Sequence, residues 1–196
     1  MLRERKKARP NARRRLTFPN LITLARILSV PVLVWAIASG EMLIAFLLFV
    51  AAGVSDLVDG FLAKRFGMTS EIGAYLDPLA DKVLIVSIYV ALGITGDIPR
   101  WLVILVVSRD IMIVGAVLLS WVVGKPVELK PLFVSKLNTA AQIIFACLVL
   151  ASLGFKFNAG PVQTIAMALV AILTLLSVAF YVAEWVRHLN SAPAEH

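Results

Sequence analysis

Long apolar runs separated by short polar breaks dominate the pattern of this chain. Six runs approach the length of a membrane-spanning helix, which needs about 20 largely apolar residues. They cover about residues 21–38, 42–66, 73–94, 101–123, 132–153 and 162–185. The runs are too long for strands and lack strict alternation of apolar and polar positions. The pattern therefore predicts an all-α integral membrane protein, folded as a bundle of six transmembrane helices.

The breaks between the runs carry glycine, proline or charge, which are turn signals. They lie near residues 39–41, 67–70, 96–99, 124–126 and 158–161. We expect residues 1–17 to form a basic N-terminal arm, residues 18–190 one membrane domain, and residues 191–196 a C-terminal tail.

Composition and charge support lipid as the solvent. Hydrophobic residues make up 60% of the chain, whereas soluble domains have roughly 45–50%. The net charge is +7, and eight basic residues crowd the first fifteen positions. Nothing else in the chain resembles a nucleic-acid module, so no nucleic-acid partner is expected. A secretory signal also begins with basic residues, but here Arg26 interrupts the first apolar run and more runs follow. The basic arm is best interpreted as a cytoplasmic flank that touches anionic lipid.

Loop charge predicts the orientation. The basic arm, Lys64 with Arg65, the break that holds Lys125 and Lys130, and Arg187 fall on one side of the predicted bundle. Glu41, Asp97, Arg100 and Lys156 fall on the other side. Cytoplasmic loops carry the excess of Lys and Arg, so both termini are predicted to be cytoplasmic.

Four aspartates lie in the second and third runs, although carboxylates are costly there. Asp56 and Asp59 are spaced i, i+3, and Asp77 and Asp81 are spaced i, i+4, so each pair shares one helix face. Each carboxylate inside a spanning helix costs about 2.5–3.5 kcal/mol on insertion scales. Opposed on antiparallel helices, the four would also repel one another unless cations neutralised them. Oxygen ligands without nearby His or Cys suit two Mg²⁺ or Mn²⁺ ions, which could clamp a phosphoryl group.

Plainer interpretations of these residues exist. The acids can form ordinary salt bridges at helix ends with Lys64, Arg65 and Lys82. Small residues near the acids (Gly60, Ala63 and Gly73) can permit close helix packing, or they can leave room for a nucleotide beside the metals.

The run from Asp56 to Asp81 resembles the signature of the CDP-alcohol phosphatidyltransferases, D-x2-D-G-x2-A-R-x8-G-x3-D-x3-D. All spacings match across the twenty-six positions. One position departs, because Lys64 stands where the family has Arg and so lacks the bidentate fork. Residues 19–26 are similar to the first helix of phosphatidylglycerophosphate synthases and CMP-forming cardiolipin synthases. Residues 108–110 and 130–139 are more similar to the cardiolipin synthases. The resemblance covers roughly residues 18–155.

The resemblance implies an enzyme that binds CDP-diacylglycerol with its pyrophosphate on the metals. Asp56, Asp59 and Asp77 would be metal ligands, and Asp81 would be both a ligand and the general base for the acceptor hydroxyl. That hydroxyl would attack the β-phosphorus, and CMP would leave. The nucleotide would lie beside four residues of the signature: Gly60, Ala63, Lys64 and Gly73.

An anionic acceptor would need a basic pocket. Its candidates are polar residues near helix ends: Asn20, Thr23, Arg26, Arg109 and Lys136. Alternatively, Arg109 pairs with Asp110 or with another acid, and Arg26 and Lys136 extend to the cytoplasmic face.

The expected function is transfer of a phosphatidyl group to phosphatidylglycerol, which would yield cardiolipin. The alternative acceptor is glycerol 3-phosphate. More distant alternatives are a divalent-cation transporter and a membrane protein with an inactive site. We expect a bacterial inner membrane, an active site at its cytoplasmic face, contact with membrane lipids, and a possible homodimer.

Overall fold

The computed structural model describes residues 18–66, 71–122 and 133–190, and the side chains of residues 22–58, 60, 79–115 and 133–184. Within these residues the chain is entirely helical and contains no strand. The helices are α1 (Phe18–Ala38), α2 (Met42–Phe66), α3 (Glu71–Thr95), α4 (Arg100–Val122), α5 (Phe133–Gly154) and α6 (Gly160–Asn190). The all-α prediction is confirmed. The predicted bounds agree closely, except that α6 continues beyond its predicted end at residue 185.

Three turns end α1, α3 and α5 in the same way. After α1, the Glu41 amide donates to the Ala36 carbonyl at 2.9 Å, and Gly40 has a φ of 77°. This is a Schellman cap, which needs a residue in the left-handed conformation. Gly96 takes that position after α3, and Lys156, with a φ of 57°, takes it after α5. The glycine turn signals therefore work as predicted at the first two turns, whereas the third places a lysine in the left-handed region.

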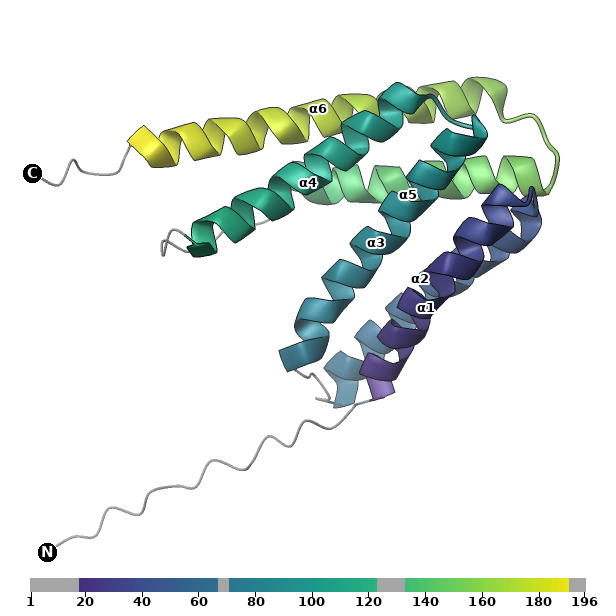
Figure 1. Cartoon of the computed structure of the whole chain (residues 1–196), viewed down its shortest axis with the longest axis horizontal. Coiled ribbons are helices and arrows are strands. Elements are labelled where there is room, and N and C mark those ends of the chain that lie inside the picture. Colours follow the sequence, from purple (N-terminus) through teal and green to yellow (C-terminus); the bar gives the residue numbers. More distant parts are fainter. Residues whose placement is uncertain (1–17, 67–70, 123–132, 191–196) are drawn as a thin grey trace, which may run out of the picture.

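The helices run up and down, and the three capped turns gather at one end of the molecule, at the upper right of Figure 1. α1 packs against α2 and α3, and α5 packs against α2 and α6. α4 contacts α6 and α3. The turns that hold Glu41 and Asp97, which carry few basic residues, therefore lie together at the capped end.

The core lies mainly where α1, α2, α3 and α5 meet. Its members are aliphatic and aromatic side chains such as Leu33, Ile88 and Phe145, all nearly fully buried. Small residues allow close approach of the helices: a Cβ on Gly154 would lie 2.9 Å from the Leu43 backbone, so the close approach of α5 to α2 there requires glycine. α2 and α5 therefore pack closely at the capped end.

Large apolar side chains also cover the outside of the bundle. Leu28, Trp35, Ile104 and Ile165 are each more than half exposed. Within the described residues, 133–154 and 160–184 form helices long and apolar enough to cross a membrane, and shorter apolar helical stretches occupy 22–38 and 42–58. An apolar exterior of this extent is unfavourable in water and suits contact with lipid.

Candidate functional site

Arg26 joins two of the four predicted aspartates. Its Nη1 lies 2.8 Å from Oδ1 of Asp56 and 2.9 Å from Oδ1 of Asp81. The Arg26 side chain is only 1% exposed, whereas those of Asp56 and Asp81 are 40% and 49% exposed. Three helices therefore meet here: α1 supplies the buried cation, and α2 and α3 each supply a carboxylate that remains open to its surroundings. The two acids converge, but not across directly opposed helices: among the described residues α1 packs against both α2 and α3, which do not pack against each other. The prediction that α2 and α3 face each other directly is therefore wrong, because α1 lies against both and its Arg26 bridges the two acids.

Several predicted residues lie on the same helices, but their side chains are outside the described residues. They are Asn20 on α1; Asp59, Ala63 and Lys64 on α2; and Gly73 and Asp77 on α3. Among the described side chains, no three acidic, histidine or cysteine residues come together. The four-carboxylate site therefore stays a prediction, and the structure places two of its members.

The donor set fits a hard divalent cation. Asp56 and Asp81 present carboxylate oxygens toward one nitrogen, and oxygen ligands of this kind suit Mg²⁺ or Mn²⁺. Gly60, one turn after Asp56, is exposed, and a Cβ built on it would meet no atom of the described residues within 4 Å. Within the described part of the chain, this glycine leaves open space on α2 where the nucleotide is predicted to approach.

A cavity of about 380 Å³ opens beside the acids, between α2, α3 and α5. Arg26, Asp56, Asp81 and Lys82 give it one charged region. Most of the remaining wall is apolar and comes from side chains such as Phe49, Leu84, Ile85, Ile143 and Cys147. The cavity therefore combines a charged region with an apolar wall, as a site for a lipid with a polar headgroup requires.

A second polar cluster lies behind Lys82. The Lys82 Nζ contacts Oδ1 of Asp110 at 2.7 Å, and Nη1 of Arg109 contacts the same oxygen at 2.6 Å. The Arg109 side chain also donates to Ser135 on α5 and Ser177 on α6. Arg109 and Asp110 are only 1% and 5% exposed. The cluster therefore connects α4, α5 and α6. Its Asp110 also pairs with Lys82, which lines the cavity.

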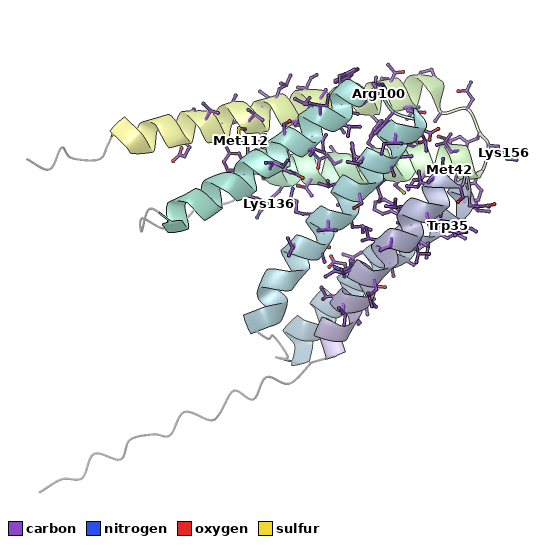
Figure 2. The ribbon with its side chains drawn as sticks, in the orientation of Figure 1. Trp35, Met42, Arg100, Met112, Lys136 and Lys156 are labelled. Atoms are coloured by element: carbon purple, nitrogen blue, oxygen red, sulfur yellow. The ribbon has the colours of Figure 1, made fainter. Side chains whose placement is uncertain are left out.

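The predicted acceptor residues reach different places. Thr23 and Arg26 are buried at the acid pair's end of α1, so Arg26 does not extend to the surface. Arg109 takes the pairing with Asp110 that the sequence left as an alternative. Lys136 is exposed near the start of α5, away from the capped end where Arg100 and Lys156 lie (Figure 2). Of the described candidates, only Arg26 lines the cavity.

Other polar residues of this region escaped the sequence analysis. Lys82 was considered only as a salt-bridge partner for the four aspartates, and Thr139 and Gln142 were not singled out, yet all three line the cavity. Polar residues one turn apart inside an apolar run were the available signal, because such residues in a membrane helix are functional candidates by default.

The chain is similar to known proteins over most of its length. The family model for CDP-alcohol phosphatidyltransferase matches residues 16–184. A rat protein named cardiolipin synthase (CMP-forming) is 37% identical over 157 residues, covering 72% of this chain and 52% of the rat protein. The chain thus spans about half the length of that relative.

Two further relatives carry a different name. A rice protein named CDP-diacylglycerol–glycerol-3-phosphate 3-phosphatidyltransferase 1, chloroplastic, is 38% identical over 66% of this chain and 44% of its own length. A Mycobacterium tuberculosis protein named probable phosphatidylglycerophosphate synthase is 31% identical over 87% of this chain and 82% of its own length. The matched family model covers all of α1 to α5 and both aspartates of the described pair. The chain belongs to the CDP-alcohol phosphatidyltransferase family.

Proposed function

We propose that this protein transfers the phosphatidyl group of CDP-diacylglycerol to a hydroxyl of a glycerol-type acceptor and releases CMP. The observation that carries the proposal is the pair of half-exposed carboxylates, Asp56 and Asp81, which meet at the buried Arg26 beside a largely apolar cavity. Phosphoryl transfer needs fixed charge at the reacting phosphates, and a lipid substrate needs an apolar wall. Both lie within this one site.

Asp81 is assigned the role of general base. It accepts the proton of the acceptor hydroxyl while the acceptor oxygen bonds to the β-phosphorus and the bond from that phosphorus to the bridging oxygen breaks. CMP carries away the electron pair of the broken bond. Arg26 holds the Asp81 carboxylate in place through their contact at 2.9 Å. A positioned base of this kind contributes roughly 10²–10⁴-fold to a rate.

The metal ligands are assigned to Asp56, Asp59, Asp77 and Asp81. Two Mg²⁺ or Mn²⁺ ions bound there would neutralise charge on the pyrophosphate and on the leaving CMP. Gly60, Ala63, Lys64 and Gly73 are assigned to the nucleotide. Lys64 would offer the phosphate of the nucleotide a single point charge, in place of the guanidinium fork of the arginine in the family signature.

Phosphatidylglycerol is the acceptor we favour, which makes the product cardiolipin. The apolar wall beside Asp81 supports a lipid acceptor, and the rat relative's name supports cardiolipin synthesis. Glycerol 3-phosphate is the second candidate, favoured by the names of the rice and M. tuberculosis relatives. The positive charge of Lys82 at the cavity suits the phosphate of either acceptor.

We also propose that all six helices span a bacterial inner membrane with both termini in the cytoplasm. The acid pair lies in the half of α2 and α3 away from the capped turns, and we propose that this half faces the cytoplasm. The exposed apolar side chains of α6, including Ile165 and Leu169, would face lipid or a second copy of the chain.

The test is to supply purified protein in detergent or vesicles with CDP-diacylglycerol, Mg²⁺ and one acceptor at a time. We expect CMP release with cardiolipin as the product when phosphatidylglycerol is present, and loss of both products with a chelator. Phosphatidylglycerophosphate formed only from glycerol 3-phosphate would instead establish the second acceptor. Movement of a divalent cation across the vesicle membrane without any CMP release would favour the transporter and overturn the proposal.

A further inference from the structure

Gln142 is the most deeply buried polar residue of the cavity. Its side chain is fully buried on α5, and neither Nε2 nor Oε1 has a hydrogen-bond partner among the described residues. The Tyr89 hydroxyl donates to the Gln142 backbone carbonyl at 3.1 Å, which fixes this turn of α5 against α3. A buried amide with both atoms unpaired costs free energy, so such groups in folded proteins call for a specific explanation.

Gln142 lies in the wall of the cavity, so a ligand in the cavity could be the partner of its amide. Gln142 lines it together with Thr139, one turn earlier on α5, and with Asp81 across from them on α3. The Thr139 hydroxyl donates to the Ser135 carbonyl at 3.2 Å, so its oxygen can still accept a hydrogen bond. The wall on α2 and α5 also includes the apolar side chains of Phe49 and Ile143. A ligand in this cavity, which Asp81 also lines, could supply the missing polar partner of the amide.

The chemistry of the amide narrows the class of ligand. A carboxamide offers one acceptor oxygen and a donor nitrogen side by side, and an alcohol hydroxyl can donate to the first and accept from the second. An ester carbonyl or a phosphate oxygen only accepts and would leave Oε1 unpaired. A hydroxyl can therefore pair with both ends of Gln142, which an ester or phosphate oxygen cannot do.

We propose that Gln142 binds the secondary hydroxyl of the acceptor's glycerol unit and so presents the neighbouring primary hydroxyl to Asp81. This inference rests on the proposed phosphatidyl transfer and adds a residue that selects the acceptor. The 1,2-diol at issue is common to phosphatidylglycerol and glycerol 3-phosphate, so the inference holds for either. A site built to pair with a hydroxyl discriminates against an analogue that lacks it, because its own buried groups are then left unpaired.

The experiment compares each acceptor with its analogue lacking the secondary hydroxyl. Phosphatidylglycerol is compared with phosphatidyl-1,3-propanediol, and glycerol 3-phosphate with 3-hydroxypropyl phosphate. For whichever pair is used, we expect wild-type kcat/KM to favour the diol by about tenfold or more. Gln142→Leu should lower kcat/KM for the diol to the level of the analogue, leave the analogue's value unchanged, and leave the KM for CDP-diacylglycerol unchanged.

Matched variants separate recognition from a structural role. Gln163→Leu changes the chain's other glutamine, near the start of α6, and should keep the wild-type preference. Gln142→Met provides a second apolar replacement of similar length, and the melting temperature of both Gln142 variants should be unchanged or higher. Equal losses on diol and analogue, or a wild-type preference retained in both Gln142 variants, would overturn the inference.

CMP release by the wild-type protein tests the proposed function separately from the role of Gln142. If wild-type protein releases no CMP with any of the four acceptors, the phosphatidyl transfer itself fails. If it turns over but uses each diol and its analogue equally well, the transfer stands and the role of Gln142 is wrong.

Discussion

Two buried arginines organise the polar interior of this protein, and they differ in what they hold. Arg26 holds Asp56 and Asp81, whose side chains are 40% and 49% exposed. Arg109 holds Asp110, whose side chain is 5% exposed, together with hydroxyls from α5 and α6. The carboxylates of the first cluster remain accessible from a cavity, whereas the hydrogen bonds of the second cluster are made to other groups of the protein.

The difference shows how one pairing of residue types serves two purposes. A buried arginine that satisfies a buried acid fixes helices relative to one another, and loss of either partner leaves an uncompensated charge. A buried arginine that faces open acids instead gathers negative charge where a cation and a phosphate can reach it. Lys82 connects the two clusters, since it contacts Asp110 and also lines the cavity.

The largest expected effect is on stability, in the closed cluster. Arg109→Leu should lower the free energy of unfolding by about 3 kcal/mol, because Asp110 keeps only the part-exposed Lys82 as a partner and two serine hydroxyls lose their donor. Arg26→Leu should cost less, since Asp56 and Asp81 can be reached by solvent or cations. Unfolding in detergent, followed by circular dichroism, measures both. Arg100→Leu, at the exposed start of α4, is the control and should change little. A larger loss for Arg26→Leu than for Arg109→Leu would contradict the comparison.

Exchanging one acid from each cluster for its amide should separate activity from structure. Asp56→Asn should reduce CMP release by about 10²–10³-fold, because it removes a charge aimed at the reacting phosphates. Asp110→Asn should reduce it only a few-fold, through Lys82, while lowering the melting temperature more. Initial rates at saturating Mg²⁺, normalised to folded protein, measure the effect. Equal rate losses in the two variants would remove the functional distinction between the clusters.

Lys82 lies between the clusters and should show an intermediate effect. Lys82→Gln removes the positive charge that faces the cavity, and we expect the KM for the acceptor to rise about tenfold, consistent with the loss of one charge-assisted hydrogen bond. Lys82→Arg should recover part of this loss. Steady-state kinetics with the acceptor varied and CDP-diacylglycerol held saturating gives the answer. A change in the KM for CDP-diacylglycerol alone would place Lys82 on the donor instead.

The smallest effect concerns the bare stretch of α2 beside Asp56. Gly60→Ala should stabilise the fold by up to about 1 kcal/mol, because a Cβ there meets no described atom within 4 Å and alanine favours helix. The same change should raise the KM for CDP-diacylglycerol a few-fold if the nucleotide approaches at Gly60. Gly115→Ala on α4 is the matched control, since its Cβ also meets nothing within 4 Å. Identical kinetics for both variants would remove Gly60 from the nucleotide site.

The sequence predicts the helices well, because long apolar runs mark them. The i, i+3 and i, i+4 spacings assign Asp59 to the helix face of Asp56 and Asp77 to that of Asp81, and this assignment stays a prediction. The side of α1 that carries Arg26 toward those acids depends on how three helices pack, and residue spacing along one helix does not contain that information.

The second cluster was harder to foresee for the same reason. The pairing of Arg109 with the adjacent Asp110 was an available alternative, but its hydroxyl partners lie 26 and 68 residues away in sequence. Gln142 shows the limit most clearly. A lone amide in an apolar run gives a weak signal, and its meaning depends on the cavity that α2, α3 and α5 form around it.

The most direct test of the central claim is a single comparison of wild type with Asp81→Asn. Both proteins receive CDP-diacylglycerol, phosphatidylglycerol and Mg²⁺, and CMP and the lipid product are measured together, with Glu41→Gln at the exposed first turn as the control. We predict that wild type and the control form CMP and cardiolipin in equal amounts, while Asp81→Asn loses about 10²–10⁴-fold in rate yet stays folded. Wild-type turnover in folded Asp81→Asn would contradict the account.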